Sequence, residues 1–240
     1  MTRSAPPTWA WGPDVARAFA WYAEAMRLWK RGPAMHALLA AITILSQFAL
    51  EVWPDAGALV SKVVVPLIAC GMLYAARAAA EGDKPRLVHA IAAFRAPAGA
   101  IAAIVVSSAL TFAAEWIAAD GLAGVNLLRP GTSPPEIDGS TVLAIYAVGI
   151  LASLPMSLVP LHALFDRSGF AVSFVDSARA FVRHAAAFLT YGAIAFALIA
   201  LGLLTMGLGL VIALPLIACA TYAAWRDLGA ATPTAAGENP

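Results

Sequence analysis

Of the 240 residues, 61% are hydrophobic and only 12% are charged, whereas a soluble domain carries about 45–50% apolar and about 25% charged residues. This excess excludes an ordinary soluble protein, because a soluble core could not bury it, and it predicts a protein embedded in lipid. The net charge of +1 excludes no class of protein by itself, since 15 basic and 14 acidic residues nearly cancel. Cys70 and Cys219 both lie in apolar segments without neighbours at metal-ligand spacing, so we expect neither a disulfide nor a zinc site.

Charge-poor segments long enough to cross a bilayer recur along the chain. A hydrocarbon core about 30 Å thick requires about 20 apolar helical residues whose backbone groups are bonded internally. The sequence therefore predicts an all-α polytopic membrane protein, with one membrane domain at 13–228 flanked by disordered segments at 1–12 and 229–240. Its six spans are expected at about 34–51, 58–78, 96–115, 140–165, 185–204 and 209–226.

The connections between the spans carry three further expectations. The glycines and threonine of 204–209 predict the turn between the last two spans. Lys62 falls inside the second span and is expected one turn from the membrane rim, where its stem lets the ammonium reach the headgroups. The segment 115–138 is expected to be an irregular outer connection, with a lid or a partner contact as the alternative.

The basic residues are distributed unevenly between the two sides of these spans. Thirteen of the 15 lie on the side of the chain termini, and only Lys62 and Arg129 lie on the other. The positive-inside rule therefore predicts that both termini are cytoplasmic, in a bacterial inner membrane. The first thirty residues have no uninterrupted apolar h-region, so we expect the N-terminus to be retained.

Internal repetition links the even-numbered spans. Residues 66–70 and 215–219 share the sequence Pro-Leu-Ile-Ala-Cys, and an arginine follows each proline by eleven positions, as Arg77 and Arg226. Pro155 begins a looser copy. Each odd-numbered span is preceded by a basic segment and a stretch of helical period, typical of an interfacial amphipathic helix. The pattern predicts three hairpin units, each consisting of an inner-surface helix, an outward span and a returning span.

Basic side chains near these inner-surface helices are candidates for contacting anionic lipid or a membrane-protein partner. The surplus of basic residues on this side could also serve only to orient the protein in the membrane, and that alternative stays open. The candidates are Arg17, Arg27, Lys30, Arg31, Arg95 and Arg183.

Prolines inside the apolar spans are candidates for kinks or gates. Each removes a backbone donor and frees a carbonyl, and interruptions at corresponding positions are typical of transport sites, although proline also serves packing in membrane helices. The candidates are Pro66, Pro155, Pro160 and Pro215. A carrier would have a continuous polar cavity bounded by Pro66, Pro155 and Pro215, whereas a tightly packed bundle would contradict that hypothesis.

No motif in the sequence specifies a reaction. We expect no Asp, Glu, Lys or Arg deep in a span, and hydroxyls that bond to the carbonyls of their own helix. Zinc-protease, phosphate-loop and nucleophile motifs are absent from the sequence. His162 and Asp166 share a helical face, either as an interfacial polar pair or as a proton-responsive or metal-binding site. We expect no enzyme activity, no catalytic residue, no cofactor, no metal and no nucleic-acid partner.

Short motifs at both ends of the chain resemble those of a known group. The segment 29–33, a proline-broken second span and the pattern of Pro215, Tyr222 and 225–227 resemble an uncharacterised proteobacterial family of six-span inner-membrane proteins. More distantly, the chain is similar to the helical membrane domain joined to some glycerophosphodiester phosphodiesterases. The resemblance covers most of 15–228 and implies no activity for particular residues, and no catalytic domain accompanies it.

Two functional hypotheses follow from the sequence. The first is a non-enzymatic membrane scaffold or accessory protein, whose basic inner helices contact anionic lipid or a partner. The second is a small permease or lipid-handling carrier that uses the proline-broken even-numbered spans. The expected absence of buried ionisable residues favours the first, and the repeated prolines favour the second.

Overall fold

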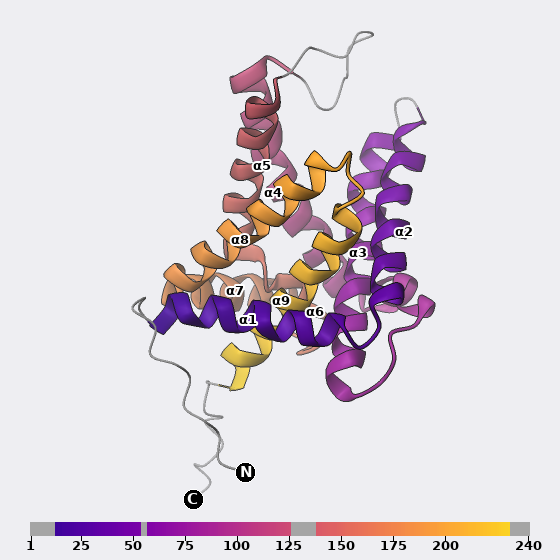
Figure 1. The fold of residues 1–240 in the computed structure, drawn as a ribbon, viewed down its shortest axis with the longest axis vertical. Coiled ribbons are helices and arrows are strands. Elements are labelled where there is room, and N and C mark those ends of the chain that lie inside the picture. The colour runs from indigo at the N-terminus through magenta and orange to yellow at the C-terminus, as the bar shows by residue number, and fades with distance from the viewer. Residues whose placement is uncertain (1–12, 54–56, 126–137, 231–240) are drawn as a thin grey trace, which may run out of the picture.

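The computed structural model describes residues 13–53, 57–125 and 138–230, and every regular element in these residues is a helix (Figure 1). Six helices are long and apolar enough to cross a membrane. They are α2 (Pro33–Glu51), α3 (Gly57–Glu81), α4 (Ala98–Ala123), α5 (Gly139–Ser153) with its 3₁₀ extension η2 (Leu154–Met156), α8 (Ala185–Leu204) and α9 (Leu210–Ala230). The structure thus confirms an all-helical chain with six potential spans.

Three of the sequence predictions fall wholly or largely on residues outside those described. Of the segments predicted to be disordered, 1–12 and 231–240 lie outside the described residues, whereas 229–230 belong to helix α9 and that part of the prediction is wrong. So does 126–137, which is most of the predicted outer connection.

The membrane-length helices surround a common centre. Helix α3 packs against α4, α4 against α5, α5 against α8, α8 against α9, and α9 returns to α3. These contacts make a ring of five helices, and α2 lies outside it against α3 and α9. Because each helix of the ring touches two others, the space at its centre is bounded by segments far apart in the sequence.

Shorter helices gather at one end of this ring. Helix α1 (Pro13–Trp29) runs across that end and packs on α8 and α9, and α6 (Val159–Leu164) and α7 (Phe170–Arg183) lie nearby (Figure 1). Four residues at helical spacing bury one face of α1, namely Ala18, Trp21, Ala25 and Leu28. Phe19 and Met26 remain exposed. Helix α1 therefore has one apolar face for the bundle and further apolar side chains available to lipid.

The second amphipathic segment, predicted from residue 84 onward, is the 3₁₀ helix η1 (Leu87–Arg95). It packs closely on α3, where a Cβ added to Gly71 would lie 2.8 Å from the Cα of Ala90. Glycine at position 71 therefore allows the two backbones to approach each other.

The third span is longer than the sequence predicts. Helix α4 does not end near residue 115 but continues to Ala123, where Gly124, with a φ of 62°, ends it in the left-handed conformation. Glu115 consequently lies inside a membrane-length helix, with eight residues beyond it. The sequence placed Glu115 at the end of the third span, whereas it is an interior residue of α4. The expectation that no acidic residue lies deep in the membrane stays a prediction.

The fourth span is broken, whereas the sequence predicted one span over 140–165. Helix α5 ends at Ser153, and α6 begins only at Val159. Pro155 and Pro160 lack the N–H groups that would continue the α-helical ladder. The backbone of this break is bonded by Ser177 of α7, which accepts from the Leu158 N–H (3.2 Å) and donates to the Pro155 carbonyl (2.8 Å).

The other two candidate kink positions do not interrupt their helices. Pro66 and Pro215 lie inside α3 and α9, which continue on both sides of them. The turn predicted between the last two spans is confirmed, because α8 ends at Leu204 and α9 begins at Leu210. Gly207 has a φ of 84° in this turn, a conformation that glycine adopts without strain.

Candidate functional site

A cleft of about 610 Å³ lies between α3, α4 and α9, with the α5–η2–α6 junction at its base. Its polar lining comprises Ser107, Ser108, Thr111, Glu115, Ser153, Ser157 and Thr221. A smaller cleft of about 280 Å³ shares five lining residues with it and adds Gln47 and Lys62. The two clefts therefore adjoin each other. Together they follow α3 from Lys62 to Leu73, which corresponds to about 17 Å along a helix, roughly half of a bilayer core.

Two side chains of opposite charge lie at the mouth of the cleft. The Lys62 Nζ is 4.2 Å from the ring centroid of Phe112 in α4, a cation–π geometry. Lys62 thus lies over a ring of a neighbouring membrane-length helix, and the expectation that its stem reaches the headgroups stays a prediction. The Glu115 carboxylate packs on Gly149 of α5, where an added Cβ would lie 2.2 Å from its Oε1. Any larger residue at position 149 would displace the carboxylate.

The hydroxyls on the cleft wall are already donating hydrogen bonds. Ser107 donates to the Ile104 carbonyl (2.9 Å), and Ser157 donates to the Leu154 carbonyl (2.9 Å). Ser153 and Thr111 make equivalent bonds within their own helices. This is the arrangement that the sequence predicted for in-span hydroxyls. A hydroxyl has one proton and two lone pairs, so each of these oxygens can still accept.

Aromatic rings cluster around Phe165, outside the residues that line the cleft. Phe165 follows α6, and its ring centroid lies 5.2 Å from that of Tyr74, 6.1 Å from that of Tyr222 and 5.7 Å from that of Trp225. Arg77 lies over the same ring, with its Cζ 5.0 Å from the centroid. We call Tyr74, Phe165, Tyr222 and Trp225 the aromatic barrier. It joins the ends of the second, fourth and sixth spans, which are the copies of the sequence repeat.

The pair of His162 and Asp166 lies beside the aromatic barrier. The His162 Nδ1 is 2.6 Å from the Asp166 Oδ2, and the Trp225 indole N–H donates to the same oxygen at 3.1 Å. His162 and Asp166 both line two surface pockets at the α1 end. Arg179 lines one of these two pockets as well. Among the described residues, no group of three or more His, Cys, Asp or Glu is arranged to hold a metal ion.

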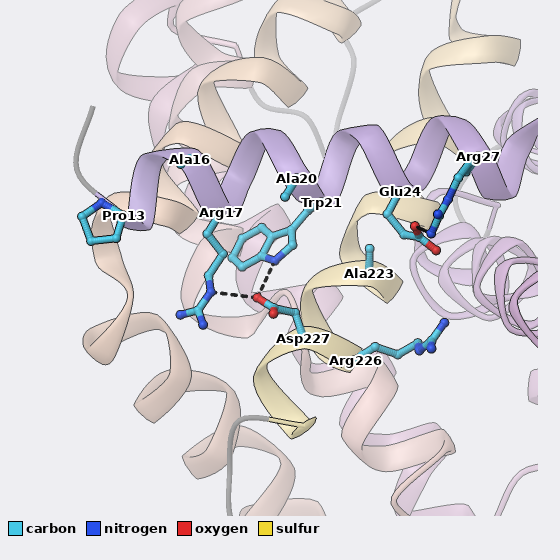
Figure 2. Close-up of a pocket in the computed structure, with 10 residues that line it drawn as sticks. All are labelled: Pro13, Ala16, Arg17, Ala20, Trp21, Glu24, Arg27, Ala223, Arg226 and Asp227. Atoms are coloured by element: carbon cyan, nitrogen blue, oxygen red, sulfur yellow. Dashed lines mark hydrogen bonds and ion pairs between the residues drawn. The ribbon is translucent and has the colours of Figure 1, made fainter. Parts of the chain in front are cut away.

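A surface groove of about 530 Å³ runs between α1 and α9 (Figure 2). The Arg17 Nε lies 2.8 Å from the Asp227 Oδ2, and the Trp21 indole N–H donates to that same oxygen at 3.0 Å. Figure 2 shows these side chains converging at one part of the groove, with Arg27 and Arg226 toward its other end. Arg17 therefore fastens α1 to the last helix, a role different from the lipid contact predicted for it.

The other predicted lipid-contact residues differ in their exposure and in their bonding partners. Arg27 is 77% exposed and pairs only with Glu24 of its own helix. Arg31 donates to the Ala79 carbonyl of α3. The exposed side chains of Lys30, Arg95 and Arg183 complete the set. Sequence reasoning did not include Arg226, although the repeated Pro-to-Arg spacing marks it and its exposed side chain lines the α1–α9 groove.

The carrier hypothesis requires the candidate prolines to line the cavity, and only two of the four do so. Pro66 and Pro160 line the cleft, whereas Pro215 is buried and Pro155 lies outside the lining.

Glu115 and Gly149 are the important residues that sequence reasoning missed. The apolar residues on both sides of Glu115, Ala113-Ala114 and Trp116-Ile117-Ala118, are the signal that could have revealed it. No local signal marks Gly149, because its importance depends on a different helix.

No protein-family model matches the chain, and comparisons with curated proteins and with solved structures found no significant similarity. The resemblance carried by the short motifs therefore stays a prediction, and the function has to be argued from the geometry of the cleft.

Proposed function

We propose that this protein is a small permease or lipid-handling carrier that binds an amphipathic molecule in the cleft between α3, α4 and α9. The observation that carries the proposal is the cleft itself, whose lining extends from Glu115 to Pro160 and which adjoins the smaller cleft at Lys62. Small-molecule sites are typically concave and largely apolar with a few polar groups. An ionisable residue inside a span is by default a functional-site hypothesis, and Glu115 is such a residue.

In the proposed carrier, the segment that moves is the part of the fourth span that follows its break. Transporters commonly place binding sites at interrupted helices and expose them to the two sides of the membrane in turn. Here the interruption forms the base of the cleft and leads directly into Phe165 of the barrier. Movement of α6 would shift Phe165 away from Tyr74 and Tyr222 and so connect the cleft to the α1 end.

Copurification tests whether the cleft holds a ligand. The protein would be purified in native lipid, and the small molecules that accompany it would be identified by mass spectrometry. Ser108→Phe fills the cleft and should remove such a molecule. Ala109→Phe is the matched control, because Ala109 is exposed on the same helix and does not line the cleft. Retention of the same molecules by both variants would contradict the proposal.

The proposed setting is the bacterial inner membrane with both termini cytoplasmic, and with three hairpin units related by repetition. The uneven distribution of basic residues supports this orientation, and the packing of α2 on α3, α4 on α5 and α8 on α9 supports the units. A reporter that is active only in the periplasm should be inactive when fused after Asp227. Activity of that fusion would reverse the orientation.

The second candidate function is a non-enzymatic scaffold or accessory protein that contacts anionic lipid or a protein partner. The observation in its favour is the exposed surface of α1 and the residues after it, where Arg27, Lys30 and Arg31 lie near Phe19 and Met26. Replacing the three basic residues by glutamine should reduce the anionic lipid that copurifies. If lipid retention does not change, this second function is contradicted.

A further inference from the structure

We infer that the ligand of the cleft is a zwitterionic amphiphile, whose ammonium and acidic groups lie between Glu115 and Lys62 and whose apolar body lies toward Pro160. The inference rests on the proposed carrier function and names the chemical class of its ligand. Its source is the juxtaposition of one positive and one negative side chain at the mouth of a mostly apolar cleft.

The first step concerns charge. Lys62 and Glu115 both line the smaller cleft, yet they do not form an ion pair in the part of the chain that the structure describes. The ammonium rests on Phe112 instead, and the carboxylate rests on Gly149. A ligand with a single charge would leave one of the two groups uncompensated at membrane depth, which is costly. A zwitterion compensates both.

The second step orients the ligand. Thr111 and Glu115 lie one helical turn apart on the same face of α4, and both line the cleft. The Thr111 hydroxyl donates to the Ser107 carbonyl (3.2 Å), so toward a ligand its oxygen acts as an acceptor. Acceptors around a carboxylate suit an ammonium group, which has three donors and no acceptor. The ligand's ammonium therefore lies at Glu115 and Thr111, and its acidic group lies at Lys62.

The third step concerns the body of the ligand. Below the charged mouth, the cleft is walled by Leu73, Ile104, Met156, Leu214 and Ile217. A cleft of about 610 Å³ with such walls falls in the range of sites that hold drug-sized ligands. A ligand consisting of the zwitterionic group alone would leave these apolar walls uncovered. An attached acyl chain would cover them.

The test compares headgroups on one acyl chain, using the purified full-length protein. Native mass spectrometry would measure binding of lysophosphatidylethanolamine, lysophosphatidylglycerol and monoacylglycerol of equal chain length. Glycerophosphoethanolamine, which has the same phosphodiester headgroup without the acyl chain, distinguishes a water-soluble zwitterion from a lipid. The expected order places lysophosphatidylethanolamine first by about tenfold. Glu115→Gln should remove this preference over lysophosphatidylglycerol, and Lys62→Gln should weaken binding of both phospholipids.

Two further variants keep the result interpretable. Asp120→Asn removes an exposed carboxylate of the same helix outside the cleft and should change nothing. The exchange variant Lys62→Glu with Glu115→Lys retains both charges and should bind lysophosphatidylethanolamine better than either single variant. Each protein would be compared by its melting temperature, so that a loss of folding is not mistaken for a loss of binding.

Each outcome bears on a different claim. Equal binding of all three headgroups, lost in Ser108→Phe, would overturn the zwitterion inference and leave the carrier proposal standing. Binding of no probe, or binding that Ser108→Phe does not affect, would overturn the carrier proposal as well. Tight binding of glycerophosphoethanolamine would support the charge pairing but contradict the need for an apolar body.

Discussion

The hydroxyl of Ser177 donates a hydrogen bond to the carbonyl oxygen of Pro155 over 2.8 Å, although the two residues belong to different helices. The same hydroxyl oxygen accepts from the Leu158 N–H at 3.2 Å. One side chain of α7 thus bonds two backbone groups at the break between α5 and α6. This contact allows the fourth span to remain broken at the base of the cleft without leaving these groups unpaired.

Ser177→Ala should therefore destabilise the protein measurably. The substitution leaves the Pro155 carbonyl and the Leu158 N–H without this partner, and an unsatisfied buried polar group costs about 1–3 kcal/mol. Thermal unfolding in a fixed detergent would measure the loss as a lower melting temperature. Ser173→Ala is the matched control, since the Ser173 hydroxyl, buried on the same helix, donates to the local carbonyls of Ser168 and Gly169. An equal effect of both substitutions would contradict a special role for Ser177.

The link between Arg17 and Asp227 should couple α1 to α9. Both side chains are partly exposed, at 30% and 40%, so solvent screening limits the coupling free energy to about 0.5–1 kcal/mol. A double-mutant cycle with Arg17→Gln and Asp227→Asn would measure it, with amide hydrogen exchange of α1 as the readout. The Arg27→Gln control should leave exchange at the Arg17 end unchanged, because Arg27 pairs within its own helix. Strictly additive single effects would show that the pair is not coupled.

The aromatic barrier should restrict access to the cleft from the α1 end. The test starts from a variant in which Cys70 and Cys219 are replaced by alanine, and Ser157→Cys adds a single thiol. This thiol should react with a membrane-impermeant maleimide only when the reagent is added on the side of the membrane near Lys62. Adding Phe165→Ala should permit labelling from both ends of the bundle. Phe170→Ala removes an exposed ring of α7 and is the control. Labelling from the α1 end without any change at Phe165 would contradict the barrier.

His89 should titrate below the usual histidine range. Burial in η1 lowers the pKa of His89, and the neighbouring charge of Arg86 lowers it further. The neutral ring is needed there, because its Nδ1 accepts from the Arg86 backbone N–H at 3.2 Å. A depressed pKa means that the folded state binds fewer protons than the unfolded state. The stabilisation is therefore complete above about pH 6.5 and is lost as the pH falls through the folded-state pKa.

Nuclear magnetic resonance of the His89 ring would measure that pKa directly. Arg86→Gln should raise it toward the ordinary value, because it removes one of the two causes. His89→Gln should flatten the dependence of stability on pH below about 6.5. A pKa at or above the ordinary histidine value would show that η1 does not favour the neutral ring.

The hydropathy of the sequence determined where the membrane-length helices lie, and the repeat marked which span ends are related. These features are local: apolar length predicts a span, and the residues of 204–209 predict a tight turn. The prolines were a less complete guide. Pro155 and Pro160 break their span, whereas Pro66 and Pro215 lie within continuous helices.

Only the tertiary structure decided what the low fraction of charged residues means. The sequence, with 12% charged residues, predicted that no charged group lies deep in a span and that Lys62 lies near the membrane rim. The packing of α4 on α5 instead places Glu115 against Gly149, and Lys62 lies over Phe112 at the same mouth of the cleft. Whether a charge lies in lipid, in water or in a cleft depends on side chains from other helices. The period of one helix does not contain that information, so the candidate site emerged only when the helices were assembled.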